Sequence, residues 1–226
     1  MKIALFDIDG TLTASNEIDS ICFAEAFRDV FGVRVDTDWG AYEHTTDRGI
    51  ATEVLRRVRG LEPDENELNR HRARFIQLLD ERMTTLDEIA GARQFVRELF
   101  ARGWRLVLCT GAWSDSARLK LARAGFDGDL PLASCDDHAS RQAVLLHGIA
   151  LAGGGQQDVV VSFGDGTWDV LAARNLQVAF IGIGTGCDAE RLRQSGATEV
   201  FDDYRDAAAV FAAIDRLTSG RRMTSL

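Results

Sequence analysis

Lysine and proline are scarce in this chain of 226 residues. Only Lys2 and Lys120 are lysines, so arginine supplies nearly all of the basic charge, and there are 2 prolines. Basic residues are also outnumbered, because 26 Lys and Arg stand against 35 Asp and Glu, which gives a formal net charge of -9. Phosphate backbones attract basic surfaces, so this acidic balance argues against a nucleic-acid partner.

Long apolar runs and paired cysteine motifs are missing as well. No apolar stretch approaches the ~20 residues of a membrane-spanning helix. The segment before Asp7 is too short for the apolar region of a signal peptide. We therefore expect no membrane partner. The cysteines show neither a CxxC pair nor zinc-ligand spacing, so we expect free thiols in a reducing cytoplasm; they are Cys22, Cys109, Cys135 and Cys187.

The pattern of apolar residues changes along the chain. After residue 86, short apolar strands alternate with helices, which predicts a parallel sheet covered on both faces. Residues 15–83 instead show helical periodicity without a strong strand. We therefore expect an α/β, Rossmann-like core formed by residues 1–14 and 84–226, interrupted by an all-helical insert at 15–83. The tail after Ser219 is polar and basic, and we expect it to fray.

The expected elements can be placed by residue number. Strands are predicted at 2–6, 104–109, 131–135, 158–163, 177–182 and 198–201. Helices are predicted at 16–31, 47–59, 64–82, 88–101, 114–124, 140–150, 167–174, 188–195 and 206–217.

Acidic residues follow two of the predicted strands. Asp7 and Asp9 follow the first strand, two residues apart, so both carboxyl groups can reach one site. Asp165 and Asp169 follow the strand at 158–163, four residues apart where a helix begins, and share a face. Ligands of open α/β sheets bind at the carboxyl ends of strands. Four carboxylates there need a cation, and an all-oxygen site suits Mg²⁺.

A polar turn follows the strand at 104–109. Thr110 supplies a hydroxyl group, and the backbone amides from Gly111 onward can bind an anion. Together with a cation, such groups can hold a phosphoryl group, and phosphoryl transfer depends mainly on positioning and charge neutralisation.

These motifs in this order resemble the haloacid dehalogenase-like superfamily. The resemblance rests on Asp7-Ile8-Asp9-Gly10-Thr11-Leu12, on Thr110, and on Gly164-Asp165 followed by Asp169. It covers essentially the whole chain, and the insert resembles the helical type-1 cap of that superfamily. Within it, the chain is most similar to hydrolases of the phosphoglycolate-phosphatase type.

The resemblance implies a role for each motif residue. Asp7 would be the nucleophile that forms an aspartyl-phosphate, and Asp9 would be the general acid and base. Mg²⁺ would be held by Asp7, the Asp9 carbonyl group and Asp165, with Asp169 acting through water. Thr110 and Gly111 would bind the phosphoryl oxygens.

The family usually places a lysine upstream of its last acidic motif. Arg141 opens a predicted helix 24 residues before Asp165 and is the favoured equivalent. Arginine binds phosphate bidentately and stays charged. Lys120 is the alternative, although its place in the middle of a helix favours a surface position.

The loop between the first two helices of the insert lies where the family keeps its specificity loop. Arg48 is a candidate for binding an anionic substrate group, and His44 for a hydrogen bond. The alternative is a simple helix start capped by Thr46 or Asp47, with Arg48 in solvent. Trp113 is a candidate for lining the pocket, with core packing as the alternative.

The leading functional hypothesis is a Mg²⁺-dependent phosphatase acting on a small phosphorylated metabolite, as a monomer or homodimer. A phosphomutase would use the same residues. A dehalogenase is disfavoured because its chemistry needs no acid for the leaving group, which is the role of Asp9. A non-catalytic binding protein is disfavoured by the presence of all four aspartates.

Overall fold

A six-stranded parallel sheet organises the chain, which the computed structural model describes over residues 1–126, 128–155 and 158–219. The strands lie in the order β3-β2-β1-β4-β5-β6. Their bounds are β1 Lys2–Phe6, β2 Arg105–Cys109, β3 Leu132–Ala133, β4 Val159–Gly164, β5 Ala179–Ile183 and β6 Val200–Phe201. The expected α/β class with a parallel sheet is thereby confirmed. The expected fraying after Ser219 concerns residues that lie outside the described ranges.

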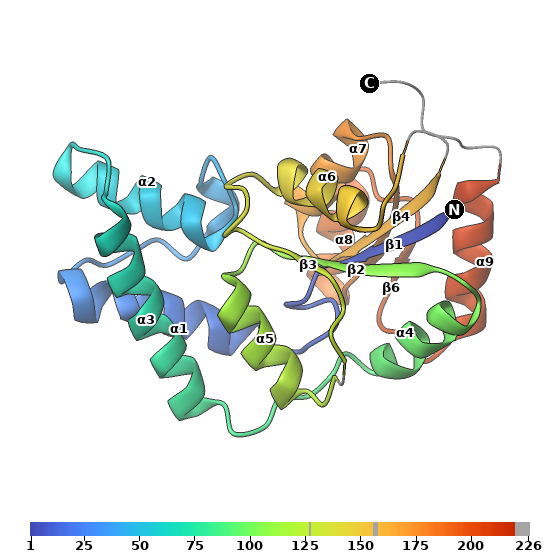
Figure 1. Ribbon diagram of the computed structural model, residues 1–226, viewed down its shortest axis with the longest axis horizontal. Coiled ribbons are helices and arrows are strands. Elements are labelled where there is room, and N and C mark those ends of the chain that lie inside the picture. The colour runs from blue at the N-terminus through green and yellow to red at the C-terminus, as the bar shows by residue number, and fades with distance from the viewer. Residues whose placement is uncertain (127, 156–157, 220–226) are drawn as a thin grey trace.

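Side chains of β1 alternate between two hydrophobic clusters, one on each face of the sheet. Ala4 and Phe6 belong to one cluster, and Ile3 and Leu5 belong to the other. The first cluster includes residues of α4 (Ala92–Ala101), α5 (Ser114–Arg123) and α9 (Ala207–Thr218). The second includes residues of α6 (Arg141–Leu151), α7 (Thr167–Asn175) and α8 (Gly186–Gln194). Helices therefore cover both faces of the sheet (Figure 1).

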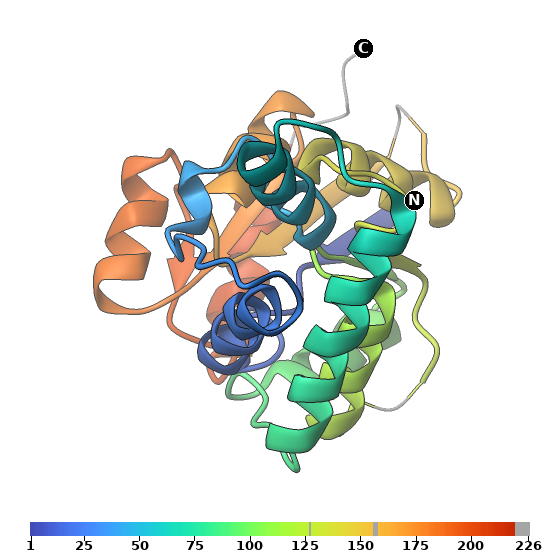
Figure 2. The ribbon, with the colours of Figure 1, turned by 90° about the vertical axis from the view of Figure 1, so that its left-hand side faces the viewer.

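The first three helices after β1 form a separate layer. They are α1 (Asn16–Phe31), α2 (Asp47–Arg59) and α3 (Glu65–Arg82), with a short 3-10 turn at Trp39–Ala41. They lie beyond the carboxyl ends of the strands, at the left of Figure 1 and toward the viewer in Figure 2. Their apolar cluster also takes in Trp113 and Cys135 from the core segment, so the layer packs onto the core. The exact bounds of a cap domain at 15–83 stay a prediction.

Local signals explain several helix starts, and one start was wrongly predicted. Asp64 and Glu67 form a capping box at the start of α3. Helix α4, however, begins at Ala92 rather than at residue 88. Glu88 is paired with Thr13 in an antiparallel bridge, and Gly91 adopts a φ of 81° before the helix can start. A tertiary contact with the segment after β1 thus overrides the helical pattern of residues 88–91.

Among the residues that the structure describes, no helix is both long enough and apolar enough to cross a membrane.

Candidate active site

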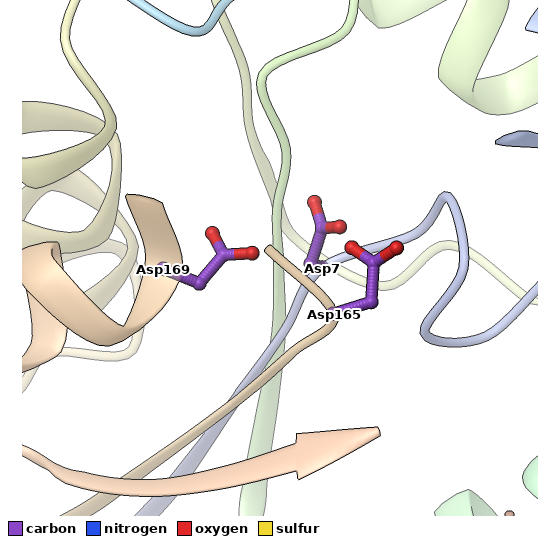
Figure 3. A group of neighbouring side chains, drawn as sticks. All are labelled: Asp7, Asp165 and Asp169. Atoms are coloured by element: carbon purple, nitrogen blue, oxygen red, sulfur yellow. The ribbon is translucent and has the colours of Figure 1, made fainter. Parts of the chain in front are cut away.

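The carboxyl ends of β1 and β4 bring three aspartates together. Oxygen atoms of Asp7, Asp165 and Asp169 lie within 4.8 Å of one another. Figure 3 shows Asp7 just after β1, Asp165 just after β4, and Asp169 in the first turn of α7. The backbone N–H of Asp7 donates to the Phe163 carbonyl at 3.0 Å, so the sheet itself fixes the position of Asp7.

The three carboxylates repel one another in a buried place. Burial raises the pKa of Asp7 to about 7, an effect that Arg141 opposes and that Asp169 and Asp9 reinforce. Burial and the neighbouring Asp7 and Asp169 also raise the pKa of Asp165 well above its usual value. Repulsion of this kind is relieved when a cation binds between the carboxylates.

The residues of this cluster fit a hard divalent cation. All three side chains offer oxygen ligands, which Mg²⁺ prefers. Gly10 leaves room next to Asp165 for this arrangement, because a Cβ atom at position 10 would collide with the Asp165 carboxylate and the Asn16 amide. Asn16 donates to Asp165 Oδ2 at 2.7 Å and orients that carboxylate. Asn16 was not predicted from the sequence.

Arg141 is the cation nearest to Asp7 among the described side chains. Its Nη2 donates to Asp7 Oδ1 at 2.8 Å, and its Nε donates to Asp169 Oδ1 at 3.0 Å. Ser140 caps the start of α6, which places Arg141 in the first turn of that helix, facing the strand ends. The buried guanidinium group thereby bridges Asp7 and Asp169, while a phosphoryl group at Asp7 would lie within its reach.

Thr110 and Gly111 follow β2 and line the same cavity as Asp7 and Arg141. Thr110 is buried, and its Oγ1 accepts a hydrogen bond from the Ala112 N–H at 3.1 Å. A Cβ atom at Gly111 would lie 2.9 Å from the Thr45 carbonyl oxygen and 3.1 Å from Arg141 Nη1. The glycine therefore permits close contact between the core and the loop before α2. The Gly111 carbonyl group also accepts from the Asp47 N–H at 2.8 Å.

A cavity of about 620 Å³ lies between the strand ends and the inserted helices. Its core-side lining includes Asp7, Asp9, Thr110, Gly111, Arg141 and Asp165. The inserted layer contributes apolar residues, among them Phe23, Trp39 and Ile50. Acidic residues outnumber basic ones in the lining, and the exposed Arg191 is already paired with Asp188. The cavity is large enough for a small substrate.

The specificity residues predicted from the sequence lie elsewhere. Arg48 pairs with Glu65 at the start of α3, and neither Arg48 nor His44 lines the cavity that the described residues form. Thr46 caps α2 by accepting from the Gly49 N–H at 3.1 Å, so the capping alternative accounts for this loop. The neighbouring Thr45, Thr46 and Asp47 line the cavity instead.

Trp113 does not line the cavity either. Its ring is buried in the apolar cluster of the inserted helices, so the packing alternative describes it. Its backbone N–H donates to Asp47 Oδ2 at 2.9 Å.

The expected surface position of Lys120 is wrong, because its side chain is completely buried. Its Nζ lies 2.7 and 2.6 Å from the two carboxylate oxygens of Asp9 and 2.6 Å from Asp19 Oδ1. A signal was available in the sequence. Ala117 and Leu121 form the apolar stripe of α5, which Ala124 continues at the C-cap, and Lys120 falls within the same stripe.

Comparison with known families agrees with this geometry. Residues 4–174 match the family model of haloacid dehalogenase-like hydrolases. The chain therefore belongs to the haloacid dehalogenase-like hydrolase family. Comparison with curated proteins gave no match.

Solved structures share the fold over nearly the whole chain. A hydrolase from Pseudomonas syringae has 20% sequence identity and a TM-score of 0.76, covering 94% of this chain and 98% of its own. A Bacteroides vulgatus protein, provisionally assigned as a beta-phosphoglucomutase, has 17% identity and a TM-score of 0.75. The match covers 96% of this chain and 90% of that protein. A predicted phosphoglycolate phosphatase from Haemophilus somnus 129PT has 18% identity and a TM-score of 0.65. The match covers 93% of this chain and 98% of that protein. These likenesses concern the fold.

Proposed function

We propose that this protein is a Mg²⁺-dependent phosphatase that hydrolyses a small phosphorylated metabolite. One observation carries the proposal: a buried carboxylate, Asp7, faces Arg141 at 2.8 Å and lies beside two further aspartates at a cavity floor. Asp7, Asp165 and Asp169, with the Asp9 carbonyl group, would hold Mg²⁺. When bound, the ion would neutralise charge on the transferred phosphoryl group.

Asp7 acts as the nucleophile in the proposed reaction. Its carboxylate oxygen forms a bond to phosphorus while the bond from phosphorus to the alcohol oxygen breaks. Arg141, Thr110 and Gly111 hold the phosphoryl oxygens during this step. Asp9 gives its proton to the departing alcohol oxygen and is left as a carboxylate.

Asp9 acts as the base in the second half of the reaction. It takes a proton from a water molecule, whose oxygen attacks phosphorus and releases Asp7 and inorganic phosphate. The inserted helices would limit the access of bulk water to the cavity.

The four cysteines are free, which supports the expected cytoplasmic location.

The test is phosphate release from a panel of phosphorylated metabolites and p-nitrophenyl phosphate with Mg²⁺. We expect hydrolysis by the wild type and a complete loss with Asp7→Asn, which keeps the shape of the side chain but removes the nucleophile. Ser219→Ala is a control remote from the site. Absence of hydrolysis over the whole panel, or activity in Asp7→Asn, would refute the proposal.

A phosphomutase is the second candidate, favoured by the fold that the chain shares with the Bacteroides vulgatus protein. The same residues would then return the phosphoryl group to a sugar hydroxyl. The panel distinguishes the two, since a mutase isomerises a sugar phosphate in the presence of a bisphosphate and releases little inorganic phosphate.

A further inference from the structure

The ammonium group of Lys120 uses all of its hydrogen-bonding capacity inside the protein. It has three N–H donors, and its Nζ lies within 2.7 Å of three carboxylate oxygens, two of Asp9 and one of Asp19. Burial opposes the charge, but Asp19 and Asp9 raise the pKa of Lys120 above the usual lysine value. Lys120 therefore carries a positive charge in a place with no exposed surface.

A second side chain is directed at the same carboxylate. Ser15 precedes α1 at the position where a serine usually caps a helix, but its side chain makes no capping hydrogen bond. Its hydroxyl donates to Asp9 Oδ1 instead and is itself bonded to Thr13 at 2.8 Å. The local preference for capping is thus given up, and the Asp9 carboxylate is held from two sides.

The charges around Lys120 come from three elements. Asp9 lies after β1, Asp19 lies in α1, and Asp47 at the start of α2 is a further negative neighbour. An unpaired buried ammonium group is strongly destabilising, so its placement here depends on these carboxylates. The site links the Asp9 loop to the first inserted helix through one cation.

We propose that Lys120 is a positioning residue that holds the Asp9 carboxylate in place for its task as the base in the hydrolytic half of the reaction. This inference rests on the proposed phosphatase function. A base must lie within hydrogen-bond reach of the water whose proton it takes, and its contribution is about 10²- to 10⁴-fold. An ion pair to both carboxylate oxygens fixes the orientation that such reach requires.

p-Nitrophenyl phosphate separates the two halves of the reaction. Its leaving group departs without a proton, so phosphorylation of Asp7 does not depend on Asp9 as an acid. Release of the aspartyl-phosphate does depend on Asp9 as a base. A displaced Asp9 therefore slows the second half and leaves the first half intact.

The experiment is rapid mixing of Lys120→Met with p-nitrophenyl phosphate and Mg²⁺. We expect a burst of p-nitrophenol approaching one equivalent per active site, followed by a steady state at least about 10²-fold slower than that of the wild type. The burst rate should stay close to the wild-type rate of phosphorylation. Lys2→Met, which removes the other, exposed lysine, should behave as the wild type.

Two further variants keep the inference testable if Lys120→Met folds poorly. Lys120→Met/Asp19→Asn removes the cation together with one of its two partners, which limits the repulsion left behind, and should show the same burst. Ser15→Ala should also slow the steady state relative to the burst, but by a smaller factor. Thermal unfolding followed by circular dichroism confirms that each variant is folded.

The outcomes separate this inference from the proposed function. Equal slowing of the burst and the steady state would show a structural role, and an unchanged steady state would show no role; either result overturns the inference alone. Failure of the wild type to release phosphate from any substrate would overturn the proposed function itself.

Discussion

Replacement of Arg141 tests whether arginine fulfils the task that the family usually gives to lysine. The guanidinium group bonds Asp7 at 2.8 Å and Asp169 at 3.0 Å in a buried position. Removal of one group that stabilises developing charge in a transition state, such as an arginine that holds a transferred phosphoryl group, costs about 2.7–4 kcal/mol. At about 1.4 kcal/mol for each factor of ten, Arg141→Ala should lower kcat/KM by about 10² to 10³.

Arg141→Lys should restore part of this loss. A lysine keeps the charge but has one nitrogen, so it cannot reach Asp7 and Asp169 through separate atoms as Nη2 and Nε do. Loss of one hydrogen bond to a charged group costs about 1.5–3 kcal/mol, which corresponds to about 10- to 100-fold in kcat/KM. The order of activity should therefore be wild type, then Arg141→Lys, then Arg141→Ala.

The assay is steady-state and rapid-mixing kinetics with p-nitrophenyl phosphate at saturating Mg²⁺. Arg141→Ala should slow the burst phase, because Arg141 acts on the phosphoryl group while Asp7 attacks. Lys120→Met should slow only the steady state. If Arg141→Ala keeps wild-type kcat/KM while Lys120→Ala abolishes turnover, Lys120 is the essential cation and the assignment of Arg141 is refuted.

Three further predictions concern metal, substrate charge and pH. Asp165→Asn should raise the Mg²⁺ concentration needed for half-maximal activity at least about tenfold, and Mg²⁺ should raise the Tm of the wild type but not of this variant. Glu17 and Asp38 line the cavity, and Arg191 is already paired with Asp188. The kcat/KM for phosphate monoesters of neutral or amine-bearing alcohols should therefore be about fivefold to tenfold higher than the kcat/KM for carboxylated analogues. A higher kcat/KM for the carboxylated analogue would contradict this prediction. Burial lowers the pKa of His71 from 6.5 to about 4, so below pH 6.5 the unfolded chain binds a proton at this residue that the folded chain does not, and the contribution of His71 to stability falls as the pH falls. In urea unfolding, the free energy of unfolding of the wild type should fall by about 2 kcal/mol relative to that of His71→Phe between about pH 7.5 and pH 5, because the buried carboxyl groups contribute equally to both proteins.

The order of elements could be predicted because each strand and helix carries its own periodicity. The site could be predicted in part, since Asp7, Thr110 and Asp165 each stand directly after a strand, and parallel strands end at one edge. The prediction that residues 88–91 form the first turn of a helix was wrong because their conformation is not set locally. Their conformation depends on pairing with Thr13, which no local pattern encodes.

The cap residues were harder to predict because a loop sequence does not fix where its side chains lie. Arg48 near the proposed phosphoryl-binding site suggested an anion contact, yet it lies in the first turn of α2 and pairs with Glu65. The residues that line the cavity are Thr45, Thr46 and Asp47. These residues reach the cavity because the Asp47 N–H donates a hydrogen bond to the Gly111 carbonyl group, a contact between segments far apart in sequence.

Lys120 shows where inference from sequence stops for a physical reason. The apolar stripe of α5 places position 120 on the buried face, but a lysine there is tolerable only with compensating charge. That charge comes from Asp9 and Asp19, which lie 111 and 101 residues earlier in the chain. Periodicity indicates which face is buried, whereas only the fold determines whether an ion buried there finds its partners. A charged residue within an apolar stripe is therefore better treated as a sign of an unseen partner than as evidence that the stripe ends.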